Sequence, residues 1–192
     1  MKVIQLHQEE KQLIMLAVEN NRQAQQQIYA KFSSKMLSVC RQYIKDIHHA
    51  EDVMITGFMK VFTNLKNFEH KGSFEGWIRR IMVYECIDFL RVKKNNFNHQ
   101  DIDDVMICEN ESVYEMEDFS VDDIQNMIDN LPDGYKMVFN LYAIEGYKHQ
   151  EIAEMLKISE GTSKSQLSHA RKLLQQQITE LKKKLNDIAT IR

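Results

Sequence analysis

The chain has 192 residues, of which 43% are apolar and 28% charged, and its formal net charge is −3. This length suffices for one larger domain or two small ones, and the apolar share can build a core, which excludes a wholly disordered chain. The sequence contains one proline and six glycines. So few helix-breaking residues favour an all-α protein.

The start of the chain and its cysteines give expectations about compartment. Charged residues interrupt the start before a long apolar run develops, and no window has the apolar length of a membrane span. We therefore expect a soluble, cytoplasmic protein without membrane contact of its own. Cys40, Cys86 and Cys108 lie far apart and form no CxxC pair. We expect Cys40 and Cys86 to be buried, reduced thiols.

The first part of the chain has the pattern of several amphipathic helices. Apolar residues recur at nearly helical spacing over residues 9–20, 23–46 and 48–65. Each stripe needs a partner to cover it, so the three predict a helical bundle. The stripes consist of Leu13, Leu16 and Ala17, then Ile28, Phe32, Leu37, Cys40 and Ile44, then Val53, Phe58, Val61, Phe62 and Leu65.

The next segment, GSFEGWIRRIMVYECIDFLRVKK over residues 72–94, holds the only tryptophan. Ser73 can cap a helix that begins at Phe74. At about 100° per residue, one side of this helix is apolar and predicts a core face. That side carries Ile78, Met82, Cys86 and Phe89, with Val83 and Leu90 beside them, and the opposite side carries Trp77, Arg80, Tyr84, Asp88 and Arg91.

An outward face of arginines and aromatic rings suits nucleic acid, since guanidinium groups pair with phosphates and rings stack on exposed bases. The alternative is structural. In that interpretation Trp77 packs on a neighbouring helix while the arginines form surface ion pairs. Periodicity alone leaves both interpretations open.

A strongly acidic segment follows. Residues 95–123 contain ten Asp or Glu and no Lys or Arg, whereas residues 1–94 have a net charge of +5 and residues 124–192 of +2. The segment has no sustained helical stripe, so we expect an extended linker. The linker is either a solvated tether or an extended acidic segment that lies in a basic channel of a partner.

The last part predicts two helices and then a helix-turn-helix. Residues 121–147 read as two helices separated near Leu131–Pro132. Over residues 149–174, Ile152, Ala153 and Leu156 form the inward face of a first helix, Ile158 fills the turn, and Ser159 can cap a second helix.

The second helix of this motif keeps Leu167, Ala170 and Leu174 inward. Short polar and basic residues on its other face are what a DNA major groove accepts. An ordinary helical hairpin is the alternative. The outward residues are Lys164, Ser165, Ser168, His169 and Lys172, with Thr162 and Arg171 at the edge.

The two halves together resemble a bacterial RNA polymerase sigma factor of the extracytoplasmic-function (ECF) group of the sigma-70 family. The segment AEDVMITGFMKVFTNLKNFEHKGSFEGWIRRIMVYECIDFLR resembles region two of that group, and LPDGYKMVFNLYAIEGYKHQEIAEMLKISEGTSKSQLSHARKLL resembles region four. The resemblance implies an all-α fold of two domains, a region-two domain over 1–94 and a region-four domain over 123–192, joined by the linker 95–122.

The resemblance also implies partners and site residues. The partners would be promoter DNA, core RNA polymerase through the clamp helices of its largest subunit and its flap, and an anti-sigma factor. The loop 66–73 would capture a flipped base of the minus-ten element. The implied polymerase contacts are Ala50, Glu51, Asp52, Ile55 and Thr56; the minus-ten contacts are Asn67, Phe68, Ser73, Trp77, Arg80, Tyr84, Asp88 and Arg91; the minus-thirty-five contacts are Thr162, Lys164, Ser165, Ser168, His169, Arg171 and Lys172.

Several positions depart from the pattern of the family. Ile55–Thr56 stands where the family usually has Gln-Glu, Tyr84 where it often has Asn, and Gln166 and His169 where it often has Arg. The first departure supports an alternative function, a sigma-like decoy that binds an anti-sigma protein without docking on polymerase. A different helix-turn-helix regulator is a further alternative.

An enzyme is the third class of function considered. His48, His49, Glu51 and Asp52 could suggest a metal site, but adjacent helical residues point apart and no partner cluster has ligand spacing. No nucleophile–base arrangement or phosphate-binding glycine loop appears. We therefore expect no catalytic residues, no metal and no cofactor.

Overall fold

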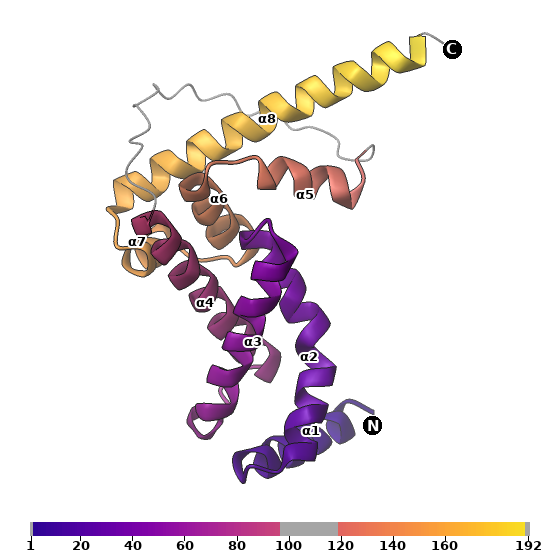
Figure 1. Ribbon diagram of the computed structural model, residues 1–192, viewed down its shortest axis with the longest axis vertical. Coiled ribbons are helices and arrows are strands. Elements are labelled where there is room, and N and C mark those ends of the chain that lie inside the picture. The colour runs from indigo at the N-terminus through magenta and orange to yellow at the C-terminus, as the bar shows by residue number, and fades with distance from the viewer. Residues whose placement is uncertain (1, 97–118, 191–192) are drawn as a thin grey trace. The chain divides into compact units, whose positions relative to one another are not determined.

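The computed structural model describes residues 2–96 and 119–190, and within these ranges every regular element is helical. The chain divides into two compact units, Met1–Asn96 and Phe97–Arg192 (Figure 1). The acidic linker expected over 95–122 falls mainly outside the described residues, and its extended form stays a prediction. Within the described ranges, none of the helices combines the length and the apolar character needed to cross a bilayer.

The first unit contains α1 (Lys2–Val18), α2 (Arg22–Tyr43), α3 (Ile47–Thr63), the short 3₁₀ helix η1 (Leu65–Asn67) and α4 (Phe74–Asn96). Helices α2, α3 and α4 each pack on the other two, and α1 packs on α2 and η1 (Figure 1). The expected helical bundle is confirmed.

Side-chain caps fix where these helices begin. The Asn21 side chain accepts a hydrogen bond from the amide of Ala24, and Asp46 accepts one from His49. Ser73 Oγ accepts a bond from Gly76 N at 3.0 Å, which confirms its expected role as the cap of α4. Each bond satisfies a backbone donor that the first helical turn leaves unpaired.

The core of the first unit follows most of the predicted stripes. Ile78, Met82 and Cys86 of α4 are fully buried, and Cys40 and Cys86 are both free, buried thiols as expected. Phe89, assigned to the core from periodicity, is only half-buried beside the ring of His49. Glu85, a carboxylate on the same helix, is buried instead, with 8% of its surface exposed.

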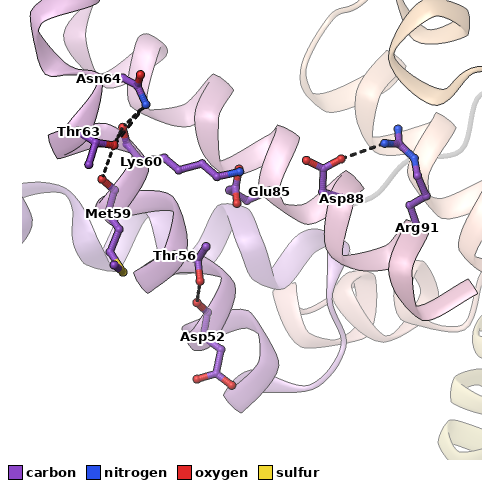
Figure 2. A network of polar contacts seen from close by, with 9 residues as sticks. All are labelled: Asp52, Thr56, Met59, Lys60, Thr63, Asn64, Glu85, Asp88 and Arg91. Atoms are coloured by element: carbon purple, nitrogen blue, oxygen red, sulfur yellow. Dashed lines mark hydrogen bonds and ion pairs between the residues drawn. The ribbon is translucent and has the colours of Figure 1, made fainter. Parts of the chain in front are cut away.

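Helices α3 and α4 cross closely at Gly57. A Cβ atom at this position would overlap Sδ of Met82 and lie 3.0 Å from its Cε. One turn further along α3, Lys60 Nζ lies 2.5 Å from Glu85 Oε1 and compensates the buried carboxylate. Glycine therefore provides the space for the crossing. The ion pair of Lys60 and Glu85 joins the same two helices (Figure 2).

The second unit contains α5 (Val121–Asp129), α6 (Asp133–Phe139), the π-helical turn η2 (Asn140–Ile144), α7 (His149–Leu156) and α8 (Glu160–Thr190). Helices α5, α6 and α7 all pack on α8. The predicted break near Leu131–Pro132 is confirmed, since Pro132 lies between α5 and α6. Asp129 and Lys136, on either side of this break, form an ion pair of 3.9 Å whose side chains are almost completely buried.

The expected helix-turn-helix is formed by α7 and α8. Lys157 adopts a left-handed backbone (φ 57°) that ends α7. Ser159 Oγ then accepts a hydrogen bond from Thr162 N at 2.9 Å and caps α8 as predicted. His149 Nδ1 lies 2.9 Å from Oγ of the buried Ser163, so the start of α7 is tied to the first turn of α8.

Substitution of Gly57 tests the close crossing. We expect Gly57→Leu to lower the free energy of unfolding by about 2 kcal/mol or more, because the added side chain overlaps Met82 in a packed core. The matched control is Gly161→Leu, where the nearest atom to a new Cβ is Ser159 Oγ at 3.6 Å. Urea denaturation followed by circular dichroism measures both. Equal stabilities of the two variants would contradict the steric argument.

The second test concerns pH. Burial lowers the pKa of His149, and the charges of Lys164 and Arg171 act in the same direction against a smaller opposing effect of Glu160. The folded chain therefore binds this proton more weakly than the unfolded chain, so acidification through the ordinary pKa of about 6.5 reduces stability. The loss is complete below the folded pKa.

We accordingly expect the melting temperature of the wild type to fall more between pH ~7.5 and ~5.5 than that of His149→Gln. The exposed His70 supplies the control, since His70→Gln keeps the tie between His149 and Ser163. Thermal melts at the two pH values measure the difference. An equal fall in the wild type and in His149→Gln would count against the assignment.

Candidate nucleic-acid interface

The outward face of α3 combines a carboxylate with apolar side chains. Asp52 is exposed, Ile55 is 49% exposed and Met59 is 65% exposed. Their spacing of three and four residues places all three on one side of the helix. Thr56 is exposed next to them, and its hydroxyl donates to the backbone carbonyl of Asp52 at 2.9 Å (Figure 2).

Two other residues that were expected on this face, Ala50 and Glu51, are not exposed. Ala50 is completely buried (0% exposed), so its side chain does not belong to this surface. Its expected contact with polymerase stays a prediction. Glu51 is half-buried and lies 3.8 Å from His48 Nδ1. No three His, Cys, Asp or Glu side chains in the described part of the chain are grouped to hold a metal ion.

The loop between η1 and α4 is anchored by an aromatic cluster. The Phe68 ring centroid lies 5.1 Å from that of Phe74 and 5.5 Å from that of Trp77. Phe74 and Trp77 are stacked at 5.9 Å with an interplanar angle of 15°. Phe68 is 8% exposed, so its ring is an anchor of the loop within the protein. Its expected contact with DNA stays a prediction.

Trp77 also differs from its expected place. It is half-buried against Phe68 and Phe74 rather than standing fully outward. A projection of α4 alone cannot show this, because the covering ring of Phe68 comes from the preceding loop. The alternative interpretation, in which Trp77 packs within the protein, is therefore partly correct. Its ring packs on a residue of the preceding loop and not on a neighbouring helix. Asn67 and Ser73, at the two ends of this loop, are both exposed.

The rest of the predicted α4 face is confirmed as a surface. Arg80 is exposed and lies over the ring of Tyr84 at 5.9 Å, and Tyr84 is 37% exposed. One turn on, Arg91 Nη1 lies 3.0 Å from Asp88 Oδ1 (Figure 2). Arg80, Tyr84 and Asp88 are exposed and Arg91 is half-buried. We call these four residues the α4 ladder.

On α8, basic side chains lie outermost and short polar ones closer to the helix. Lys164, Arg171 and Lys172 are exposed, and Lys164 Nζ lies 2.7 Å from Glu160. The hydroxyl of Thr162 bonds to Ser159 at 2.8 Å, and that of Ser165 donates to the backbone carbonyl of Thr162. The half-buried members of the predicted set are Thr162, Ser165, Ser168 and His169.

Aromatic rings from earlier helices support this face. Tyr135 stacks on His169 at 5.4 Å, and Arg171 lies over the ring of Tyr142 at 5.7 Å. Tyr142 also stacks on His149 at 4.6 Å. The faces predicted from the sequence did not include Tyr135, Tyr142 or, on α3, Met59. A helical projection that extended the stripe from Ile55 to the next turn would have found Met59.

Two models of the same protein family match this chain. The sigma-70 region 2 model matches residues 28–96 and the sigma-70 region 4 model matches residues 121–174. The first match runs from within α2 to the end of α4, and the second covers α5 to the first half of α8. The matches therefore contain the α3 face, the α4 ladder and the helix-turn-helix.

Individual relatives of this chain are also sigma factors. The ECF RNA polymerase sigma factor SigW of Bacillus subtilis is 28% identical over 164 residues, which are 78% of this chain and 86% of SigW. RNA polymerase sigma factor SigV of the same organism is 29% identical over 142 residues, 71% of this chain and 80% of SigV.

Among solved structures, the sigma factor RpoE of Bartonella quintana, in complex with the anti-sigma factor NepR, matches with a TM-score of 0.52 and 19% identity. The match covers 80% of this chain and 96% of that one, and shows a shared fold. With both family regions in order on two helical units, the chain belongs to the sigma-70 family, as an RNA polymerase sigma factor of the ECF group.

Proposed function

We propose that this sigma factor binds core polymerase and the two promoter elements through three separate surfaces. The α3 face, Asp52, Ile55, Thr56 and Met59 with Glu51 at its edge, docks on the clamp helices of the largest polymerase subunit. The loop 66–73 and the α4 ladder bind the minus-ten element. The outward side of the first half of α8 reads the minus-thirty-five element. The observation that carries the proposal is the exposure of the α3 apolar pair beside a carboxylate.

The proposed minus-ten site separates the DNA strands by binding, without a covalent step. Extruding a base from the stack costs a few kcal/mol, and a site that binds the unstacked base offsets this cost. Arg80 and Arg91 supply a salt-dependent grip on phosphates, and Tyr84 supplies a ring for stacking. Phe68 and Phe74 position Trp77 at the start of this face, so the aromatic anchor sets the geometry of the loop.

The proposed minus-thirty-five site follows the division of labour in major-groove recognition. Arg171 and Lys172 hold phosphates, whereas Ser168 and His169 lie closer to the helix axis and reach base edges. The ring of Tyr135 restricts the orientation of His169. A side chain held before binding loses less conformational entropy when it contacts DNA.

The remaining parts of the proposal concern the binding partners and the cellular compartment. We propose an initiation subunit without catalytic activity of its own, acting in the cytoplasm and contacting the polymerase flap through its region-four unit. RpoE of Bartonella quintana binds the anti-sigma factor NepR. By analogy we propose an anti-sigma partner for this chain as well. The acidic segment 95–123 would lie in a basic channel of the polymerase.

Gel filtration with sigma-free core RNA polymerase tests the proposal at its base. Co-elution at moderate salt supports docking and allows promoters to be selected with the assembled holoenzyme. A folded, helical chain that fails to co-elute would contradict polymerase docking and favour the decoy function.

Met59 gives the sharpest test of the α3 face. We expect Met59→Ala to weaken the complex with core polymerase about tenfold, since burial of a methionine stabilises by about 1.5–3 kcal/mol. Met15 on α1 is the matched control, because it is equally exposed at 65%. Titration of labelled variants into core polymerase gives both affinities. Equal losses for Met59→Ala and Met15→Ala would rule out a specific α3 contact.

Lys172 tests the α8 face through salt dependence. In the holoenzyme, Lys172→Ala should weaken promoter binding similarly for all minus-thirty-five sequences and reduce the slope of log K against log salt by about 0.9. Lys11→Ala, which removes an exposed lysine of α1, should leave the slope unchanged. Filter binding over a salt series measures the slope. An unchanged slope for Lys172→Ala would contradict a phosphate contact.

A further inference from the structure

Four side chains of the second unit form a series of contacts that begins and ends on α8. His149 Nδ1, at the start of α7, lies 2.9 Å from Oγ of Ser163 on α8. The ring of His149 stacks on that of Tyr142 at 4.6 Å, with an interplanar angle of 22°. The guanidinium of Arg171, again on α8, lies over the Tyr142 ring with Cζ 5.7 Å from the centroid. We call these four residues the α8 cluster.

Burial fixes the inner end of the α8 cluster. Ser163 is 0% exposed, so the bond to His149 satisfies a hydroxyl that water does not reach. Burial is also the main reason why the pKa of His149 is lowered, and the charges of Lys164 and Arg171 act in the same direction. The imidazole is therefore neutral near pH 7 and does not repel the guanidinium at the outer end.

Tyr142 connects the two ends from the π-helical turn η2. Its neighbour Leu141 is 0% exposed and anchors this turn in the core, whereas Tyr142 is half-buried beneath the exposed Arg171. π-helical turns occur frequently at functional sites. A tyrosine has only two side-chain torsions, so the backbone turn and the stack on His149 leave its ring little freedom.

The outer end of the α8 cluster is a long cation that the ring restrains. An unrestrained arginine loses much of its rotamer freedom when it binds a phosphate, and contact with a ring face reduces that loss. Arginine suits this arrangement because its planar guanidinium stacks on the ring and keeps its N–H groups directed outward. The next residue, Lys172, is also exposed but points about 100° further around the helix.

We propose that Tyr142 is a positioning residue for DNA binding: held by His149, its ring orients the guanidinium of Arg171 toward a DNA phosphate. The inference deepens the DNA-reading role of α8 in the proposed function and rests on that role. It does not depend on docking to polymerase, because every member of the α8 cluster lies in the second unit.

A double-mutant cycle tests the proposal in the full chain. The probe is a short fluorescent DNA duplex of mixed sequence, since phosphate contacts carry no sequence information. Fluorescence anisotropy at low ionic strength gives the affinities. We expect Arg171→Ala to weaken binding about tenfold and Tyr142→Leu about fivefold. Once Arg171 is replaced, Tyr142→Leu should cause no further loss, because the two residues act as one unit.

The matched control is the exposed neighbour Lys172. The losses caused by Lys172→Ala and Tyr142→Leu should multiply, because these two residues act independently. Tyr142→Phe should recover most of the affinity, since phenylalanine also offers a ring face.

The salt dependence separates positioning from charge. Arg171→Ala should reduce the slope of log K against log salt by about 0.9, whereas Tyr142→Leu should leave the slope unchanged because the cation remains. Arg171→Lys is a second variant at an exposed position that folding does not depend on. It should also weaken binding without a change of slope, since lysine keeps the charge but lacks the planar group.

Nuclear magnetic resonance of the free chain reports the placement of Arg171 without DNA. Protons over a ring face are shifted upfield, so the side-chain signals of Arg171 should be shifted in the wild type and in Tyr142→Phe. The shift should vanish in Tyr142→Leu and decrease in His149→Leu, which removes both the stack and the bond to Ser163.

Three results would overturn the inference alone: multiplying losses for Tyr142→Leu and Arg171→Ala, a Tyr142→Phe variant as weak as Tyr142→Leu, or unshifted Arg171 signals in the wild type. An unchanged affinity of Arg171→Ala, or a wild type that does not bind the duplex, would overturn the DNA-reading role of α8 together with it. Failure to co-elute with core polymerase concerns only the docking part of the proposed function.

Discussion

The close crossing of α3 and α4 at Gly57 is the constraint on which the first unit depends. Because glycine has no side chain, Met82 fills the space between the helices, and Lys60 can reach the buried carboxylate of Glu85 beside it. A packed interior has few alternative arrangements, so this contact fixes the rotation of both helices. Their outward sides, the α3 face and the α4 ladder, therefore keep one spacing relative to each other.

In the second unit, polar contacts fix the relative placement of the helices. The left-handed residue Lys157, the cap at Ser159 and the bond between His149 and Ser163 hold α7 against α8. Rings of the preceding helices then support the side chains that face outward. The proposed function depends on the placement of binding groups, and preorganised groups lose less entropy on binding.

Sequence reasoning succeeded where a signal is local. The caps at Ser73 and Ser159 and the break at Pro132 depend on a few neighbouring residues, and all three appear where they were expected. It did not foresee that Ala50 and Phe68 are buried, and it was only partly right about the outward position of Trp77. A projection of one helix cannot show which side an adjacent helix covers, nor that a loop ring folds back over the first turn of α4. The roles of the outward residues stay proposals.

The sequence by itself determined the helical class, the order of the elements, the helix-turn-helix and the family, because periodicity, caps and motif residues are properties of short segments. The tertiary structure decided which polar groups enter the interior. Glu85, Asp129 and Lys136 are buried because partners from neighbouring helices compensate their charges. It also decided which rings anchor and which face outward. Burial depends on contacts between distant segments, and no single helix contains that information.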